Sequence, residues 1–292
     1  MTDAPHTLRQ RLARKPILLA PGVYDPFTAL LAQAAGAEAL YLSGAGIAYT
    51  RLGRPDIGLV SMSEVADTLA LTRDRVDLPL IVDADNGYGN ALNMQRTMRC
   101  FERAGASALQ IEDQSYPKRC GHFSEKRLIG CAEMVGKVKA ALDARASAGT
   151  LVIARTDAAA VEGLSAAIDR AGAYAEAGAD ALFVEAPGSV AEMGQICGAL
   201  RGRAPLMANM VEGGRTPIAG AADLERIGFS LVIFPGGIVR AIAPAARDFY
   251  ATLLRDGTSA AMRERMVDFD GLNAILGTPE MLARGKIYEG GA

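Results

Sequence analysis

The sequence predicts an α/β fold, a (β/α)8 or TIM barrel in which eight parallel strands alternate with helices. One observation is a phrase that recurs four times: a helix ending in Gly, a minimal turn and a short buried strand. Its copies span 35–44, 104–113, 177–186 and 227–236. The other observation is a set of apolar runs that stop in polar residues, at 79–82, 151–154 and 205–208. This alternation is typical of a parallel barrel, and a doubly wound open sheet is the alternative.

The elements follow in order along the chain. Leu8 and Leu12 among basic neighbours predict an N-terminal helix within residues 1–15 that closes one end of the fold. A first strand is expected over 16–20 and a helix over 26–35. Further helices are expected at 62–77, 90–104, 132–147, 163–177, 189–201, 221–227 and 238–255. The catalytic barrel domain is therefore expected to span 16–257.

A chain of 292 residues is long for one domain but ordinary for a single barrel. Residues 258–292 are expected to form a C-terminal helical extension, because helical patterns cover 259–268 and 278–284. An extra helix beyond a closed barrel often packs on a partner subunit. We therefore expect an oligomer.

Composition excludes several classes of partner. The 31 Lys and Arg nearly balance the 33 Asp and Glu, and a net charge of −2 gives no field for nucleic acid or an anionic membrane. The apolar runs are shorter than the roughly 18 residues of a spanning helix, and no apolar signal core precedes the basic stretch at 9–15. Cys100, Cys120, Cys131 and Cys197 form no Cys-x-x-Cys pair and need no bridging. We therefore expect a cytoplasmic protein.

Polar residues end most of the predicted strands. They are Ser43, Asp83, Asp85, Glu112, Asp113, Arg155, Asp157, Glu185 and Asn209. In a parallel barrel the carboxyl ends of all strands meet on one face, where catalysis occurs. Carboxylates and amides that converge without clustered His or Cys favour Mg²⁺ or Mn²⁺ over zinc. The sequence therefore predicts one metal-dependent site.

The densest chemistry follows the strand at 108–111. Lys118 and Arg119 beside Cys120 would favour the thiolate, and Pro117 and Gly121 predict a loop that exposes it. These are the conditions for a cysteine that exchanges protons. The other interpretation is a solvated surface turn with a bystander cysteine.

The inventory as a whole suits one kind of reaction. A divalent ion beside Arg155 and His122 would hold a substrate with carboxylate and hydroxyl or keto groups, and would stabilise a developing oxyanion. Cys120 could then give or take a proton at carbon. This combination suits making or breaking a bond beside a carboxylate through an enolate. Hydride transfer is disfavoured, because the sequence contains no recognisable cofactor motif.

Lys118 to His122 reads Lys-Arg-Cys-Gly-His, which is similar to the signature of the isocitrate lyase and phosphoenolpyruvate mutase superfamily. The resemblance extends over residues 16–256. Other similar segments lie at 41–44, 53–58, 83–89, 112–114, 155–157, 183–186 and 209–217. The resemblance implies a (β/α)8 barrel with Mg²⁺ at its site, whose last helix is exchanged between the subunits of a homotetramer.

The resemblance also implies residue roles. Asp85 would ligate Mg²⁺, with Asp83, Glu112 and Asp56 acting directly or through water. The substrate-binding residues would be Ser43, Gly44, Ala45 and Arg155 for the 2-oxoacid half, and Gly121, His122 and Asn209 for the other carboxylate, with Asp83, Arg119 and Glu185 beside them. Cys120 would protonate the departing enolate, with Lys118 and Glu112 in the same catalytic group. The base for the hydroxyl proton stays open between Tyr41 and a metal-bound group.

The implied reaction cleaves a 2-hydroxy di- or tricarboxylate of the 2-methylisocitrate or 2,3-dimethylmalate type. Its products would be a 2-oxoacid such as pyruvate and a carboxylic acid. The segments 183–186 and 212–214 depart from the 2-methylisocitrate lyase pattern and favour a smaller substituted malate. The alternatives are a carboxyphosphonoenolpyruvate phosphonomutase, an oxaloacetate decarboxylase and a non-catalytic sensor of a small carboxylic acid.

Overall fold

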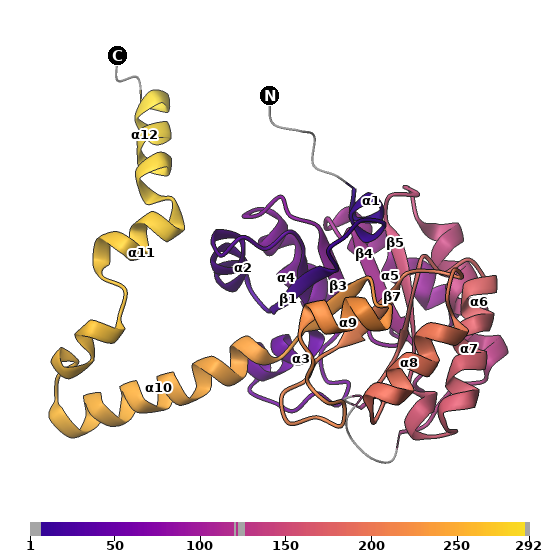
Figure 1. Ribbon diagram of the computed structural model, residues 1–292. Helices are drawn as coiled ribbons and strands as arrows, with labels where there is room; N and C mark the ends of the chain where they lie inside the picture. The colour runs from indigo at the N-terminus through magenta and orange to yellow at the C-terminus, as the bar shows by residue number, and fades with distance from the viewer. Residues whose placement is uncertain (1–6, 120, 122–125, 290–292) are drawn as a thin grey trace. The chain divides into compact units, whose positions relative to one another are not determined.

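The computed structural model describes residues 7–119, 121 and 126–289. Eight parallel strands close into a barrel in chain order, as the sequence predicts (Figure 1). The strands are β1 (Leu18–Val23), β2 (Leu40–Leu42), β3 (Leu80–Asp83), β4 (Ala108–Glu112), β5 (Leu151–Thr156), β6 (Ala181–Val184), β7 (Leu206–Asn209) and β8 (Leu231–Phe234). Closure comes from β1 pairing with β8, where Leu18 lies opposite Leu231. A doubly wound open sheet is thereby excluded.

One main helix follows each strand up to β7. These helices are α2 (Pro26–Ala34), α4 (Met62–Arg73), α5 (Ala91–Arg103), α6 (Cys131–Ala144), α7 (Leu164–Glu176), α8 (Val190–Ala199) and α9 (Ala221–Ile227). Capping side chains fix several starts: Ser61 and Glu64 satisfy each other's backbone N–H groups at α4. Within the described residues, none of the helices has both the length and the apolar character that crossing a lipid bilayer requires.

The core has two layers. Alternate strand residues, among them Leu18, Ile81 and Ile153, fill the barrel interior, while their neighbours pack outward against the helices. The short helix α1 (Leu8–Leu12) adds Leu8 and Leu12 to the interior cluster. Both leucines are almost fully buried, so α1 closes one end of the barrel.

The first strand is longer than expected. The predicted strand stopped at residue 20, before a Pro-Gly pair that is typical of a turn, yet β1 runs through Pro21 and Gly22 to Val23. Gly22 is required here because a Cβ at this position would lie 2.4 Å from the carbonyl oxygen of Pro235. The Pro-Gly pair therefore allows β1 to approach the residue after β8 closely, and it does not end the strand.

A helical segment after β2 was not predicted. It consists of α3 (Gly44–Ile47) followed directly by a π-helical turn over Ala48–Leu52. Ser43 starts it, because its Oγ accepts a hydrogen bond from the Gly46 N–H at 3.1 Å. The consequence is that Ser43 and Gly44 form a helix start at the carboxyl end of β2.

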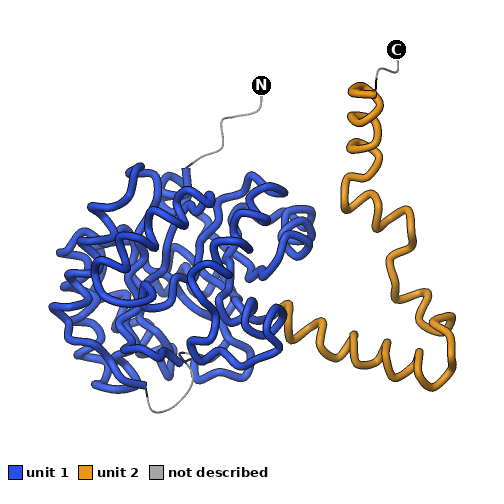
Figure 2. The backbone as a smooth tube through the Cα atoms, turned by 180° about the vertical axis from the view of Figure 1, so that it is seen from behind, with its two compact units in different colours: residues 1–237 blue, residues 238–292 orange. Residues whose placement is uncertain are grey.

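The chain divides into two compact units, residues 1–237 and 238–292 (Figure 2). The second unit contains most of α10 (Gly237–Asp256), a 3-10 helix (Ala260–Arg265), α11 (Phe269–Leu276) and α12 (Thr278–Tyr288). The sequence placed the end of the barrel domain at 257, and the division into compact units falls after Gly237, the first residue of α10. Among the described residues of the second unit, only Thr252 and Met262 are buried.

Candidate active site

The carboxyl ends of the strands bring several of the predicted site residues together. Cys120 and His122 lie outside the described residues. Asp83 ends β3, Glu112 ends β4 and Arg155 lies near the end of β5. Because all strands run in parallel, their carboxyl ends gather these charges on one rim.

Four buried carboxylates form one half of the site, and a lysine sits among them. The acids are Asp56, Asp83, Asp85 and Glu112, each less than a tenth exposed. Lys118 Nζ lies 2.6 Å from Asp56 Oδ1 and 2.7 Å from Asp85 Oδ1. Burial alone would lower the pKa of Lys118, but the charges of Asp85 and Asp56 raise it well above its usual value. Lys118 is therefore a buried, charged counter-ion of this acid cluster.

Asp85 combines an unusual backbone conformation with a perturbed carboxyl group. Its backbone is left-handed, with φ of 47°, a conformation that costs energy for residues other than Gly and that recurs at functional positions. Burial raises its pKa to about 7, with the Asp83 and Asp56 charges acting in the same direction and Lys118 opposing them. Three acids so close together need a cation to remain ionised.

The donor set fits Mg²⁺ in charge and chemistry. Among the described residues, no group of three His, Cys, Asp and Glu side chains is arranged so that it could hold a metal ion, and the Lys118 ammonium lies between Asp56 and Asp85. Glu112 Oε1 is buried and has no hydrogen-bond partner in the described part of the chain, which leaves an acceptor for a cation. Carboxylate oxygens are the ligands that Mg²⁺ prefers. The cluster therefore suits a hard divalent ion, with Lys118 as the cation now present.

Lys118 and Arg119 differ in burial. Lys118 is almost fully buried and its ammonium contacts Asp56 and Asp85, whereas Arg119, the next residue, is exposed. The sequence suggested that both cations would favour a thiolate at position 120, and that position lies outside the described residues.

Arg155 is the centre of the other half of the site. Its Nε lies 2.8 Å from Asp157 Oδ2 and 3.3 Å from Glu112 Oε2, and its Nη2 lies 3.1 Å from Asp157 Oδ1. The guanidinium also lies over the Phe183 ring, 5.2 Å from its centroid. Burial alone would lower the pKa of Arg155, but Asp157 and the other acids raise it well above its usual value. Arg155 is thus a fixed, charged donor suited to a carboxylate.

Glu185 and Asn209 lie beside Arg155. Asn209 Nδ2 donates to both carboxylate oxygens of Glu185 at 3.2 Å, while Asn209 Oδ1 is buried with no hydrogen-bond partner among the described residues. Ala186 follows Glu185 with φ of 56°, a second strained non-glycine residue at a strand end. Gly121 touches the same group, since a Cβ there would lie 2.4 Å from Arg155 Nη2 and 2.7 Å from Glu185 Oε1.

Ser43, Gly44 and Ala45 lie at the start of α3, and Gly44 approaches the acid cluster. A Cβ on Gly44 would lie 3.1 Å from Asp83 Oδ2, so the main chain approaches that carboxylate closely. The Ser43 hydroxyl oxygen accepts the Gly46 N–H, which leaves the hydroxyl proton free to donate. The predicted segment therefore lies at the rim, with its backbone next to Asp83.

Tyr41 lies in the barrel interior below this rim. Its hydroxyl donates to Gln110 Oε1 at 2.6 Å. Burial, reinforced by the Asp83 charge, raises its pKa well above the usual value of 10. In this environment Tyr41 keeps its proton and is suited to donate a hydrogen bond.

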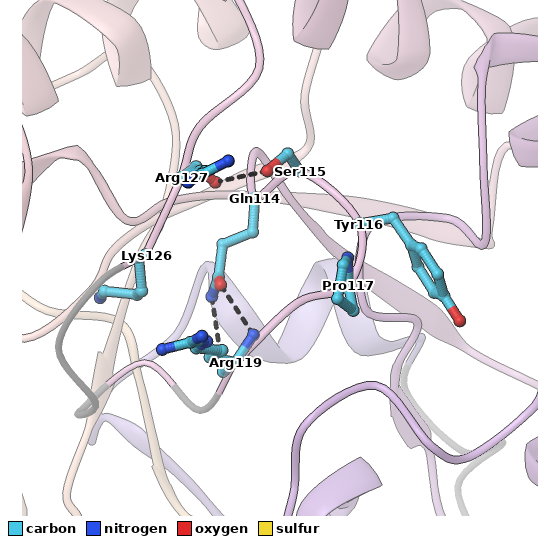
Figure 3. Close-up of a pocket in the computed structure, with 7 residues that line it drawn as sticks. All are labelled: Gln114, Ser115, Tyr116, Pro117, Arg119, Lys126 and Arg127. Atoms are coloured by element: carbon cyan, nitrogen blue, oxygen red, sulfur yellow. Dashed lines mark hydrogen bonds between the residues drawn. The ribbon is translucent and has the colours of Figure 1, made fainter.

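Hydrogen bonds between its own residues hold the segment after β4 in a closed loop. Figure 3 shows the Gln114 side chain directed at the main chain of Arg119, where Nε2 donates to the Arg119 carbonyl at 2.8 Å and Oε1 accepts the Arg119 N–H at 3.0 Å. A pocket beside this closure is lined by Gln114, Ser115, Tyr116, Pro117, Arg119, Lys126 and Arg127. Arg119, predicted to bind substrate, therefore lies in a polar pocket with two further cationic residues.

Three further charged residues hold the site: sequence reasoning placed Asp113 and Asp157 at the strand ends without giving them a specific function, and it did not name Lys126. Asp113 accepts from Thr156 Oγ1 at 2.7 Å, Tyr174 OH at 2.7 Å and the Asp157 N–H at 2.9 Å. Asp157 binds Arg155 and Lys126. Asp113 and Asp157 carried a usable signal, because both directly follow strands. Lys126 carried none, since a loop lysine is usually solvated.

Comparisons with known proteins agree on one family. The model of phosphoenolpyruvate phosphomutase matches residues 8–254. A 2,3-dimethylmalate lyase from Eubacterium barkeri is 39% identical over 92% of this chain and 93% of its own. A 2-methylisocitrate lyase from Aeropyrum pernix is 45% identical over 89% of this chain and 82% of its own. The crystal structure of a 2,3-dimethylmalate lyase superposes with a TM-score of 0.91 at 35% identity, covering 100% of this chain and 97% of the other.

Proposed function

The chain belongs to the phosphoenolpyruvate mutase and isocitrate lyase superfamily and is a lyase, and we propose that it cleaves a carbon–carbon bond in a 2-hydroxy di- or tricarboxylate. The proposed substrates are of the 2-methylisocitrate or 2,3-dimethylmalate type. The proposed products are a 2-oxoacid such as pyruvate and a carboxylic acid.

One observation carries this proposal: a cation-binding half and an anion-binding half adjoin at the same rim. Glu112 belongs to the acid cluster around Lys118, and its Oε2 lies 3.3 Å from Arg155 Nε. The acids suit a divalent ion, and Arg155 suits a carboxylate. A 2-hydroxy acid with two carboxylates presents oxygens to both halves at once.

For the metal, we propose Asp85 as the ligand of Mg²⁺, or of Mn²⁺, with Asp83, Glu112 and Asp56 acting directly or through water. Once bound, this ion would supply positive charge where a keto oxygen develops. The orphan acceptor on Glu112 supports this assignment. Removing divalent ions with a chelator should abolish activity, and Mg²⁺ should restore it.

For substrate binding, we propose that Arg155 holds the carboxylate of the 2-oxoacid half together with the backbone at Ser43, Gly44 and Ala45. Gly121, His122 and Asn209 would hold the other carboxylate. The buried, unpartnered Oδ1 of Asn209 supports a contact with a hydroxyl or protonated group of the substrate. Glu185 fixes the Asn209 amide and so sets which way that oxygen points.

The proposed reaction proceeds in two proton transfers around one bond cleavage. A base removes the hydroxyl proton, the alkoxide becomes a keto group, and the carbon–carbon bond breaks. The electron pair of that bond goes to the departing fragment, a carboxylate enolate, and the Cys120 thiol gives its proton to the enolate carbon. Because its pKa is raised, Tyr41 is better suited to orient the hydroxyl than to deprotonate it. Lys118 stays in the catalytic group as the charge that balances Asp56 and Asp85.

A coupled assay tests the reaction. The protein is given Mg²⁺ and, in parallel, 2-methylisocitrate, 2,3-dimethylmalate or oxaloacetate, and pyruvate is measured with lactate dehydrogenase. Pyruvate from one of the hydroxy acids, lost in Cys120→Ser, supports the lyase and identifies its substrate. Pyruvate from oxaloacetate alone would indicate a decarboxylase. Absence of pyruvate from all three would contradict the proposal and direct attention to phosphonates.

For assembly, we propose a homotetramer in which the last barrel helix is exchanged between subunits. The second unit exposes Tyr250, Leu254, Phe269, Met281, Leu282, Ile287 and Tyr288. Helices this apolar need a surface to cover them, and a second copy of the chain supplies one of matching composition. Light scattering should give about four times the 30.5 kDa of one chain, and a double variant Leu254→Glu, Phe269→Glu should give smaller species. A monomeric wild-type chain would contradict this assembly.

We also propose a cytoplasmic location. It rests on the cysteines, because Cys100, Cys131 and Cys197 are free thiols in the structure. Unbridged cysteines suit a reducing compartment. Fractionation of cells that produce the protein, with detection by antibody, checks this location, and recovery outside the cytoplasmic fraction would contradict it.

A further inference from the structure

We propose that Lys126 is a positioning residue of the lyase site: it fixes the main chain at Gly121 against Arg155 and Glu185. The inference rests on the proposed function, because it assigns Lys126 to the reaction of that site. Lys126 itself contacts no expected substrate group.

Lys126 is a buried cation with two partners. Its side chain is 1% exposed, and Nζ lies 2.7 Å from Asp157 Oδ1 and 2.6 Å from the Gly121 carbonyl oxygen. A buried ammonium is costly unless it is paired, and here one acid and one carbonyl share it. The ammonium therefore links β5, which ends next to Asp157, to the segment that carries Gly121.

Gly121 has almost no freedom on its other side. A Cβ there would lie 2.4 Å from Arg155 Nη2 and 2.7 Å from Glu185 Cγ, so the main chain is in contact with both side chains. The Lys126 contact pulls the carbonyl of the same residue toward Asp157. The position of Gly121 is thus set between a hydrogen bond from Lys126 and the packing surface of Arg155 and Glu185.

The base of the segment is anchored without Lys126. The Ser115 N–H donates to the Arg127 carbonyl at 2.8 Å, and the Ile129 N–H donates to the Asp113 carbonyl at 2.9 Å. These bonds flank a short antiparallel bridge between Gln114 and Leu128. Lys126 is therefore not needed to close the segment, and its contact with Gly121 lies on the side of Arg155.

Lys126 also balances the charge around Arg155. Asp157 is fully buried, and although burial alone would raise its pKa, the charges of Arg155 and Lys126 lower it to about 2. Asp157 and Glu112 thus face two cations. Without Lys126, Arg155 would be the one cationic partner left to Asp157 among the described residues.

The kinetic test uses Lys126→Met, with Arg73→Met as its matched control. Arg73 also holds backbone carbonyls, those of Gly105 and Val76, but at the opposite end of the barrel. With Mg²⁺ and the hydroxy acid that the wild type cleaves, Lys126→Met should lose on the order of 100-fold in kcat, because small misplacements of reacting groups cost this much. Its KM should change by less than about threefold, because Arg155 remains in place. Arg73→Met should keep the wild-type kcat. A kcat for Lys126→Met within about threefold of wild type would overturn the proposal.

Rescue separates positioning from general stability. In Lys126→Ala, ethylammonium at about 0.1 M should recover roughly tenfold of the lost kcat, since it can donate to Asp157 and to the Gly121 carbonyl. Tetramethylammonium has the same charge without N–H donors and should not rescue. Equal rescue by both cations, or by neither, would assign the loss to charge or to folding and overturn the proposal.

Hydrogen exchange tests the contact between Lys126 and Gly121 without any substrate. Amides in peptides spanning 113–129 should exchange faster in Lys126→Met than in wild type, and those of the other strands should not change. Faster exchange throughout the barrel would mean general destabilisation and would overturn the proposal. If the wild type cleaves none of the offered acids, the proposed function fails, while this measurement still decides whether Lys126 holds Gly121.

Discussion

The two ends of the barrel use charge in opposite ways. At the carboxyl end, Asp56, Asp85 and Lys118 are buried together, and Glu112 and Asn209 each keep a buried atom without a partner among the described residues. At the amino end, Asp180 accepts from Arg9 at 2.6 Å, from Arg145 at 2.7 Å and from the Val152 N–H at 2.8 Å. At the carboxyl end, buried polar atoms are left without partners among the described residues, whereas at the amino end the Asp180 carboxylate is used by three donors.

Backbone geometry follows the same division. The non-glycine residues with positive φ are Asp85, Tyr88 and Ala186 in the described part of the chain, and all three follow strands at the carboxyl end. At the amino end, the turns between helix and strand place glycine at such positions, as at Gly36, Gly105 and Gly178. Strain is therefore confined to the end where the site lies, which predicts that substitutions at the two ends differ in kind.

The largest expected effect on stability comes from removing the Lys118 ammonium from the acid cluster. Lys118→Met leaves Asp56 and Asp85 without their counter-ion and should lower the free energy of unfolding by about 3–5 kcal/mol at pH 8 without metal. Mg²⁺ should then stabilise the variant more than the wild type, because it meets acids that no ammonium occupies. Urea unfolding with and without Mg²⁺ measures both quantities. If Mg²⁺ stabilised the variant and the wild type equally, the carboxyl end would have no unused capacity to bind a cation, and the contrast with the amino end would be wrong.

A smaller effect is expected from the best-connected acid at the amino end. Asp180→Asn should cost about 1–2 kcal/mol of unfolding free energy, because it weakens contacts with Arg9, Arg145 and the Val152 N–H. The kcat/KM of the folded protein should stay at the wild-type value. Urea unfolding and the pyruvate assay together check this, and a catalytic defect in a stable variant would mean that the ends are coupled.

The smallest effect is a pH-dependent one at Glu102. Burial alone would raise the pKa of Glu102, but hydrogen bonds from Ala146, Thr150 and Ser147 lower it below 4.5. Its stabilising contribution is therefore complete above the unfolded pKa and fades as the pH falls through the folded pKa. Glu102→Gln should cost less than about 1 kcal/mol at pH 7, because solvent screens this partly exposed group.

The corresponding measurement is thermal unfolding between pH 3 and 7. The difference in Tm between wild type and Glu102→Gln should shrink as the pH drops. A difference that stays constant with pH would mean that the Glu102 charge has no part in stability.

The sequence was sufficient for the architecture because repeated local patterns encode it. A strand begins shortly after each of the repeated helix-ending turns. The polar residues that follow the apolar runs, from Asp83 to Asn209, lie at the carboxyl ends of the strands. The exception was β1, which was predicted over 16–20 and runs from Leu18 to Val23. Gly22 lies against Pro235, the residue after β8, and a contact between residues so far apart in the sequence cannot be read from a local pattern.

The site was predictable where its residues follow strands, and not where burial decides their role. Asp85, Arg155 and Asn209 could be named because strand ends are visible in the sequence. Lys118 and Lys126 are both loop lysines, and nothing local distinguishes them from solvated ones. Their burial depends on acids contributed by other strands, Asp85 for the first and Asp157 for the second. Such pairings are properties of the folded chain.

The short helix α1 covers the amino end of a barrel whose interior is filled with side chains. Leu8 and Leu12 are buried in that interior cluster and shield its amino end from solvent. Deleting α1 should therefore bring water closer to Tyr41 and to Gln110, whose buried Nε2 has no hydrogen-bond partner among the described residues. The five residues of α1 therefore help to determine how much water reaches the residues below the site, although α1 lies at the opposite end of the barrel.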